Sequence, residues 1–266
     1  MTSLDELFVK TRAENRAALI AYIPAGYPTH EGCKRVIETF AKSGVDAIEI
    51  GFPYSDPVMD GPTIQAAAEQ SLAAGTGARE VFESLKHATE LGIPSVVMTY
   101  WNPIEKYGVD RFAHDIAANG GSGVITPDLT IDEADRWIES THSNDINSIF
   151  VIAPSTVGER LEKVTSHCSG FVYAASIMGV TGARGGLSTG ASDLVARTRA
   201  VTPTPIAVGL GVSTREQAKE IAGFADGVIV GSAFINALRD APDLETGLEH
   251  VAQLVKELAL GVREGR

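Results

Sequence analysis

The stretch EIGFPYSDPVMDGPTIQ, from Glu49 to Gln65, carries the carboxylates best placed for catalysis. Glu49 lies near the end of an apolar run, Asp46 to Ile50, that predicts a strand. Side chains alternate along a strand, so Ile48 and Ile50 point to one face and Glu49 to the other. If the isoleucines face helices, Glu49 points into a barrel interior, where an acid is costly to bury. We interpret Glu49 as an acid–base catalyst; the alternative is a structural hydrogen-bond acceptor or ion-pair partner.

Asp60 follows in the loop after that strand, and two roles fit its position. It precedes Gly61 and Pro62, an arrangement in which Asp commonly caps a helix that begins with Pro. A carboxylate close behind Glu49 in the chain also fits a site that needs two acids. The residue types therefore leave a capping role and a functional role open.

The remaining predicted strand ends offer few groups for chemistry. No Lys ends a strand, which excludes the Schiff-base route of one class of aldolases. Asp128 comes shortly before a helix whose expected caps are Thr130 or Asp132, and its role stays open. All six histidines fall in predicted helices or loops: His30, His87, His114, His142, His167 and His250. Without converging His and carboxylate ligands, we expect no catalytic metal.

Two glycine-containing turns predict a phosphate site. They are Gly209-Leu210-Gly211 and Gly231-Ser232-Ala233, and each follows a predicted strand and leads into a helical pattern. Glycine lets the backbone approach an anion, and a helix N-terminus presents free N–H groups. A third segment, Met178 to Gly186, holds four glycines in nine residues. It predicts a mobile lid over the substrate, with a merely disordered connection as the alternative.

Repeated βα units must position these groups. Eight short β-branched runs, most of them followed by a helical pattern, predict eight strands. They are Leu19 to Ile23, Asp46 to Ile50, Ser95 to Tyr100, Gly123 to Thr126, Ser148 to Ala153, Phe171 to Ser176, Pro205 to Gly209 and Gly227 to Gly231. Such a series predicts a (β/α)8 TIM barrel with an N-terminal helix, an insertion after strand 2 and a closing helix beginning near Leu244. We expect residues 1–266 to form one domain.

The composition of the chain limits the classes of molecule that it is expected to bind. The chain has 22 Lys and Arg against 34 Asp and Glu, a net charge of −12, so its surface repels nucleic acid. Its two cysteines, Cys33 and Cys168, give no disulfide framework and fit small buried hydrophobic roles. No apolar run approaches a membrane span, and the first residues lack the apolar region of a secretory signal. We expect a cytoplasmic protein whose partners are proteins or small molecules.

Taken together, EIGFPYSDPVMDGPTIQ, the MGVTG segment, GLGVS and VGSA closely resemble the tryptophan synthase alpha subunit family over essentially the whole chain. The resemblance implies a lyase that cleaves indole-3-glycerol phosphate into indole and glyceraldehyde 3-phosphate. It implies that Glu49 shuttles protons between indole C3 and the substrate hydroxyl, while Asp60 stabilises the ring nitrogen. Two inward carboxylates suit that reaction, because a protonated indole ring is its own electron sink.

The resemblance also implies binding residues, position by position. Gly182, Gly211, Gly231 and Ser232 match phosphate binders, and Thr181 and Tyr173 match a lid threonine and a tyrosine of the substrate site. Tyr22, Ile64, Met98, Tyr100, Ile125, Leu210 and Ile229 would form the indole pocket, although each also fits ordinary core packing.

Members of the family pair with a separate β subunit in an αββα complex. The β subunit receives indole through a tunnel and condenses it with L-serine. That subunit holds pyridoxal phosphate, so we expect no cofactor in this chain. The loops after strands 2 and 6 face the partner in the family. Met59, Thr130 and Ile177 depart from the family pattern, which puts details of this surface in doubt.

Three other functions stay open. A phosphoribosyl isomerase of the same fold needs acids after strands 1 and 5, where this chain has Tyr-Ile-Pro-Ala-Gly and Ala-Pro-Ser. A non-catalytic partner that only regulates a β subunit would not need the complete carboxylate set. A free-standing lyase that releases indole would need no partner.

Overall fold

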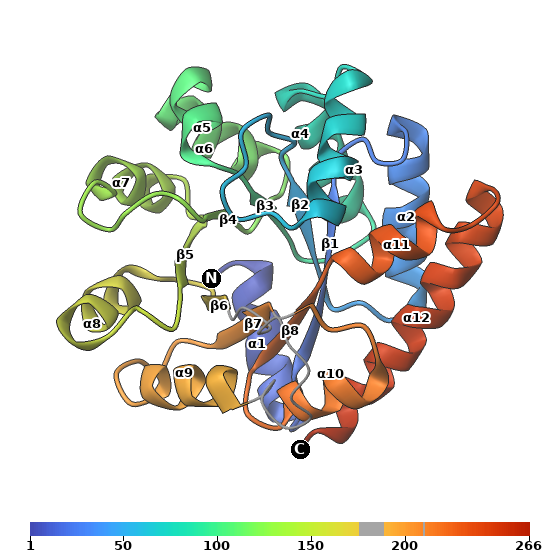
Figure 1. Ribbon diagram of the computed structural model, residues 1–266. Helices are drawn as coiled ribbons and strands as arrows, with labels where there is room; N and C mark the ends of the chain where they lie inside the picture. Colours follow the sequence, from blue (N-terminus) through green and yellow to red (C-terminus); the bar gives the residue numbers. More distant parts are fainter. Residues whose placement is uncertain (176–188, 210) are drawn as a thin grey trace.

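The computed structural model describes residues 1–175, 189–209 and 211–266 (Figure 1). Eight parallel strands pair in chain order and close into a barrel: β1 (Ala18–Pro24), β2 (Ala47–Gly51), β3 (Ser95–Met98), β4 (Gly123–Thr126), β5 (Asn147–Ile152), β6 (Val172–Ala175), β7 (Ile206–Gly209) and β8 (Gly227–Val230). All eight predicted strands are confirmed, with ends that shift by one or two residues. The predicted (β/α)8 barrel is therefore the observed fold.

The described helices lie around the barrel as an outer layer, except for the first, which lies across its amino-terminal end (Figure 1). They are α1 (Ser3–Ala13), α2 (His30–Ser43), α3 (Pro62–Ala73), α4 (Ala78–Glu90), α5 (Trp101–Tyr107), α6 (Val109–Ala118), α7 (Asp135–Ser143), α8 (Gly158–His167), α9 (Thr189–Arg199), α10 (Arg215–Ala222), α11 (Ser232–Arg239) and α12 (Leu244–Glu264). The insertion predicted after strand 2 is the segment that leads into α3. The predicted N-terminal and closing helices are α1 and α12.

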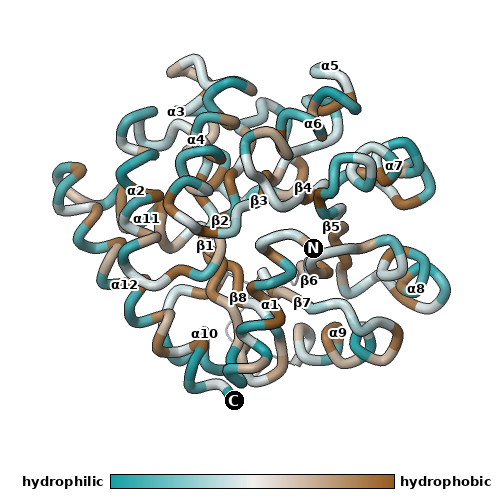
Figure 2. The backbone as a smooth tube through the Cα atoms, turned by 180° about the vertical axis from the view of Figure 1, so that it is seen from behind, coloured by the Kyte–Doolittle hydropathy of each residue, from teal (hydrophilic) through white to brown (hydrophobic). Residues whose placement is uncertain are grey.

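Two hydrophobic clusters separate the inside of the barrel from the layer beneath the helices. Ala47 packs in the interior cluster with Ile20 and Phe171, whereas Ile48 and Ile50 pack in the outer cluster with helix side chains. Alternation along β2 therefore directs Glu49 inward, as its sequence position predicts. In Figure 2 the strands are mostly brown and much of the helical layer is teal, the pattern of buried parallel strands.

Helix α1 lies in the middle of the ring of strands when it is viewed from either side (Figures 1 and 2). Its residues Leu4, Leu7 and Phe8 pack into the interior cluster. A capping box between Thr2 and Asp5 starts the helix, and Thr2 Oγ1 accepts a hydrogen bond of 2.8 Å from the Asn147 amide at the start of β5. Helix α1 is thereby fixed across the amino-terminal end of the barrel.

The same end carries a buried ion pair. Arg16 donates a hydrogen bond of 2.8 Å to each carboxylate oxygen of Asp46, and Asp46 also accepts one from the backbone N–H of Leu19. The pair joins the residue before β2 to the start of β1, so it fixes the register of the strand that carries Glu49. Among the described helices, none is long and apolar enough to cross a membrane.

Replacing Asp46 by Ala should destabilise the fold by about 3 kcal/mol, because the buried Arg16 guanidinium would lose both bonds to Asp46 and keep only the more exposed Glu14 as an ion-pair partner. Urea denaturation measures the effect. Asp132→Ala is the matched control, since Asp132 pairs with Lys163 and Arg160 on the exposed surface and should cost less than about 1 kcal/mol. Equal losses in the two variants would show that the buried pair is unimportant.

Candidate active site

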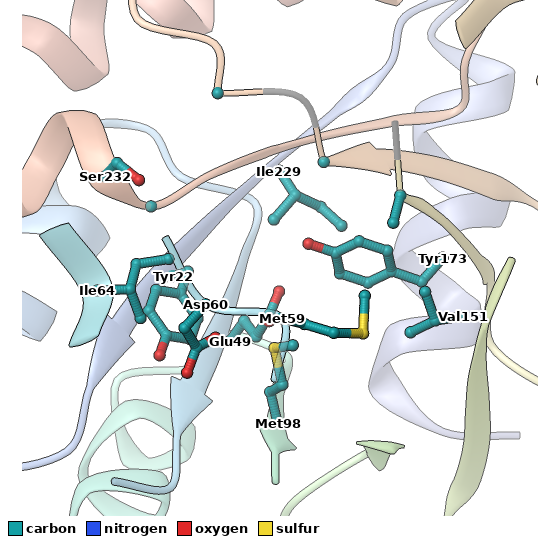
Figure 3. Close-up of a pocket in the computed structure, with 14 residues that line it drawn as sticks. Tyr22, Glu49, Met59, Asp60, Ile64, Met98, Val151, Tyr173, Ile229 and Ser232 are labelled. Carbon is teal, nitrogen blue, oxygen red and sulfur yellow. The ribbon is translucent and has the colours of Figure 1, made fainter. Parts of the chain in front are cut away.

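A cavity of about 300 Å³ opens at the carboxyl end of the barrel strands (Figure 3). Its lining comes from seven of the eight strands and from the segments that follow them. The lining residues are Tyr22, Glu49, Met59, Asp60, Ile64, Met98, Val151, Tyr173, Ala175, Gly209, Gly211, Ile229, Gly231 and Ser232. Both candidate carboxylates and the described candidate phosphate binders thus lie in one cavity.

Glu49 lies at the bottom of this cavity, with 1 % of its surface exposed. Among the described residues, neither carboxylate oxygen has a hydrogen-bond partner. Burial, and secondarily the negative charge of Asp60, raises the pKa of Glu49 from 4.5 to about 8. The group is therefore protonated at neutral pH and can deliver that proton to a bound molecule. Within the part of the chain that the structure describes, no ion pair or hydrogen bond supports the structural alternative.

Asp60 lies in the segment between β2 and α3. The helix cap is Gly61, with no side-chain hydrogen bond, and Pro62 is the first residue of α3. The Asp60 carbonyl, not its carboxylate, accepts a 2.8 Å bond from the Gln65 amide. The capping interpretation of Asp60 is therefore wrong. Burial raises the pKa of its carboxyl, while a hydrogen bond from the Tyr100 hydroxyl opposes that shift.

Tyr100, which follows β3 as the N-cap of α5, holds this segment in place. Its hydroxyl oxygen accepts a 3.1 Å bond from the Met59 backbone N–H, and its ring packs against Tyr54 with centroids 5.2 Å apart. Burial raises the pKa of Tyr100 to about 12, so its hydroxyl stays neutral and can donate to Asp60. Tyr100 does not itself line the cavity. Ile125, also expected in the indole pocket, packs in the interior cluster instead.

Glycines at the strand ends make room for two tyrosine rings. A Cβ on Gly51 would lie 2.4 Å from the Tyr22 hydroxyl oxygen, and one on Gly231 would lie 2.9 Å from the Tyr22 ring. A Cβ on Gly209 would lie 2.4 Å from the Tyr173 hydroxyl oxygen. Any side chain at these positions would displace a ring from the cavity wall. The absence of a side chain at these glycines therefore lets the two tyrosine rings pack against the backbone.

The phosphate end has one helix N-terminus. Helix α11 begins at Ser232 with Gly231 as its cap and no side-chain hydrogen bond, so its first N–H groups have no capping side chain. The expected helix after β7 begins only at Arg215, and a Thr214–Gln217 capping box satisfies its first donors. Gly211 reaches the cavity instead in the left-handed region, with φ of 64°. An anion would meet the backbone of Gly211 and the start of α11.

The remaining residues singled out in the sequence either cap a helix, do not cap the helix expected, or lie outside the described residues. Asp128 accepts a 2.8 Å bond from the Trp101 backbone N–H and so caps α5 from the neighbouring strand end. The caps expected for the next helix, Thr130 and Asp132, are wrong, since α7 starts after Ala134. Thr181, Gly182 and Leu210, together with the expected lid from Met178 to Gly186 and the departure at Ile177, lie outside the described residues.

Sequence reasoning missed two lining residues, Val151 and Ala175, whereas Gly209 belongs to a turn that the sequence predicts to bind phosphate. Val151 lies two positions after Ile149 of the interior cluster, and Ala175 lies two positions after Tyr173. Alternation along β5 and β6 would therefore have found both. Met59, considered only as a departure in the partner surface, also lines the cavity.

A closed parallel barrel with a buried acid, a second carboxylate and an uncapped helix N-terminus after strand 8 is the framework of a (β/α)8 enzyme for a phosphorylated small molecule. Residues 8–263 match the family model described as tryptophan synthase alpha chain. The chain belongs to that family.

Related sequences match this chain over nearly its whole length. The chain is 51 % identical over 266 residues to the tryptophan synthase alpha chain of Thermobifida fusca, covering 99 % of this chain and 98 % of the relative. It is 51 % identical over 261 residues to that of Mycobacterium marinum, covering 98 % and 95 %. Family members are lyases of tryptophan biosynthesis that cleave indole-3-glycerol phosphate.

Solved structures agree in fold. A chain of tryptophan synthase from M. tuberculosis, in an open form, is 46 % identical with a TM-score of 0.91, covering 99 % of both chains. The tryptophan synthase alpha chain of Legionella pneumophila is 31 % identical with a TM-score of 0.89, covering 98 % of this chain and 97 % of that one. The family needs no cofactor in this subunit, because pyridoxal phosphate belongs to the β subunit.

Replacing Glu49 by Gln should change how stability depends on pH. Between about pH 4.5 and 8 the unfolded chain has released the Glu49 proton while the folded chain keeps it, so rising pH destabilises the parent. Gln cannot ionise, so relative to the parent the variant should gain roughly 2 to 5 kcal/mol between these limits. Urea denaturation at both pH values measures this gain. A constant difference between variant and parent would show that Glu49 is solvated.

Replacing Gly51 by Ala should cost about 1 to 3 kcal/mol, because the new methyl overlaps the Tyr22 ring. Adding Tyr22→Leu should return part of that loss, since the shorter side chain vacates the space. Gly190→Ala in α9 is the control and should not destabilise, because nothing lies within 4 Å of its new Cβ. Chemical denaturation compares them, and an unchanged Gly51→Ala variant would contradict the close contact.

Proposed function

We propose that Glu49 is the acid–base group of indole-3-glycerol phosphate cleavage in this chain and that Asp60 binds the ring nitrogen. The observation that carries this proposal is the buried Glu49 carboxyl, without a partner and with its pKa near 8. A group that must first give and then take a proton near neutral pH needs such a pKa. Asp60 lines the same cavity and supplies the second carboxylate.

The cleavage proceeds through a protonated indole. Glu49 gives its proton to C3 of the ring, and positive charge develops on the ring nitrogen, whose N–H donates to Asp60. The Glu49 carboxylate then accepts the proton of the side-chain hydroxyl next to the bond that breaks. The carbonyl of glyceraldehyde 3-phosphate forms, the bond to C3 breaks, and its electron pair restores the aromatic ring of indole. Glu49 ends protonated, as it began.

The phosphate is bound at the opposite side of the cavity. Figure 3 places Ser232 apart from Glu49 and Asp60, so one end of the substrate meets amides while the other meets carboxylates. Gly211, Gly231 and the start of α11 supply N–H groups, and Ser232 adds a hydroxyl. Tyr22, Ile64, Met98, Tyr173 and Ile229 enclose the indole between them. An acidic protein can bind a phosphate here because the donors are local.

The β subunit docks, in this proposal, beside the segment between β2 and α3. Val58 and Met59 expose 75 % and 45 % of their surfaces there, directly before Asp60. Contact with a partner at these apolar side chains would couple assembly to the position of Asp60. Indole then passes to the β subunit for condensation with L-serine. We further infer a cytoplasmic location and one domain over residues 1–266.

Glu49→Gln should lower the rate of indole release from indole-3-glycerol phosphate by about 10²- to 10⁴-fold, because the amide of Gln can neither give nor take the proton. Asp60→Asn should lower it by about 10²-fold, because the amide cannot compensate the charge on the ring nitrogen. Both rates are measured with the chain alone and in complex with its β subunit. Asp132→Asn, at an exposed ion pair, is the control and should keep the parental rate.

Near-normal cleavage by Glu49→Gln would overturn the acid–base assignment. If the complex made tryptophan from indole and serine but never from indole-3-glycerol phosphate, the chain would be a regulatory partner only. Full activity without the β subunit would identify a free-standing lyase. Turnover of a phosphoribosyl substrate without indole release would identify an isomerase.

A further inference from the structure

Tyr22 occupies a defined place between two strand ends. It is paired with Glu49 across β1 and β2, and its ring extends from Gly231, which follows β8, to Gly51 on β2. The ring atoms and the hydroxyl lie where a Cβ on either glycine would clash, so the ring has little freedom to turn. The strands therefore deliver the hydroxyl to the side of the cavity formed by β2.

The hydroxyl of Tyr22 lies on the carboxylate side of the cavity. Figure 3 shows its oxygen close to the Asp60 carboxylate, with Glu49 next to both. Burial raises the pKa of Tyr22 well above its ordinary value; of the charged groups around it, Asp60 contributes most, followed by Glu49, Tyr100 and Tyr173. For Tyr173, across the cavity, Glu49 contributes more than Asp60. Tyr22 is thus influenced more by Asp60 than by Glu49, and Tyr173 more by Glu49 than by Asp60.

In the part of the chain that the structure describes, the Tyr22 hydroxyl donates no hydrogen bond. A neutral phenol in a closed cavity has one proton to donate, and an anion is the acceptor that gains most from it. The Asp60 carboxylate already accepts from the Tyr100 hydroxyl, yet burial still raises its pKa. A substrate that fills the cavity would remove more water from Asp60 and increase that shift. A second donor would oppose it.

We propose that Tyr22 is a positioning residue whose hydroxyl donates to the Asp60 carboxylate when substrate is bound, holding Asp60 ionised and directed at the ring nitrogen. This role goes beyond forming the apolar wall, and it rests on the function proposed above for Asp60. Tyr22 on β1 and Tyr100 after β3 then both donate to Asp60, while Glu49 stays protonated. The hydroxyl, rather than the ring, carries the effect.

The test is Tyr22→Phe, which removes one oxygen and keeps the ring. The pH dependence of kcat for indole-3-glycerol phosphate cleavage is measured in the complex with the β subunit, because kcat reports the pKa values of the enzyme with substrate bound. A hydrogen bond to the charged form lowers a pKa, so its loss should move the acid limb up by about one pH unit. The rate below that limb should fall about tenfold. The fall should appear in kcat more than in KM, because the apolar contacts of the ring remain.

The matched control is Tyr107→Phe. Tyr107 donates its hydroxyl to Asp115 in the outer layer, so this variant loses the same kind of bond away from the cavity. Its pH profile should equal that of the parent. A shift as large as that of Tyr22→Phe would show a general effect of stability.

Asp60→Asn separates this proposal from the function on which it rests. In that background Tyr22→Phe should change kcat by less than about twofold, since the acceptor charge is gone. If Asp60→Asn leaves cleavage unchanged, the proposed role of Asp60 fails. If Asp60→Asn lowers the rate but Tyr22→Phe leaves the acid limb in place, only the role of Tyr22 fails, and its ring is a wall. Equal effects of Tyr22→Phe in both backgrounds would also overturn it.

Discussion

A carboxyl group buried without a partner is the constraint on which the rest of the structure depends. Glu49 lies on the inner face of β2, where both of its oxygens lack hydrogen-bond partners among the described residues. A solvated glutamate would be ionised at neutral pH and could not protonate a carbon atom. The closed barrel limits solvation by packing side chains around the group except where it faces the cavity. The same burial that makes Glu49 an acid therefore weakens the fold whenever that acid ionises.

The second carboxylate, Asp60, has polar neighbours that Glu49 lacks, and the segments at the strand ends supply them. Asp60 is reached by hydroxyl groups, and Tyr100 fixes its segment through the Met59 N–H. Strand ends that terminate in glycine allow large aromatic rings to lie close to the backbone without widening the barrel. One small cavity thus gives two acids of the same chemistry different surroundings, because Asp60 has polar neighbours while Glu49 has no hydrogen-bond partner among the described residues.

How much of this could be predicted depends on the range of the interactions. Eight buried parallel strands leave β-branched runs, and alternation alone directed Glu49 inward. Asp60 stayed ambiguous because a cap and a catalyst use the same residue type, and only the geometry of Gly61 separates them. The cap of α10 was readable, since Thr214 and Gln217 form a capping-box pattern. The contacts of Tyr100 with Met59 and of Asp128 with Trp101 join distant segments, and no local pattern encodes them.

The floor formed by α1 has a consequence for traffic through the site. Because Leu4, Leu7 and Phe8 fill the amino-terminal end of the barrel, the cavity is closed on that side. Substrate and both products must therefore use the rim where the strands end. The amides that we propose to bind phosphate belong to that rim and Glu49 lies deeper, so the phosphorylated product would lie beside the opening of the cavity. Indole has no exit through the floor, so its route to the β subunit, which we propose to dock beside Val58 and Met59, must begin at the rim.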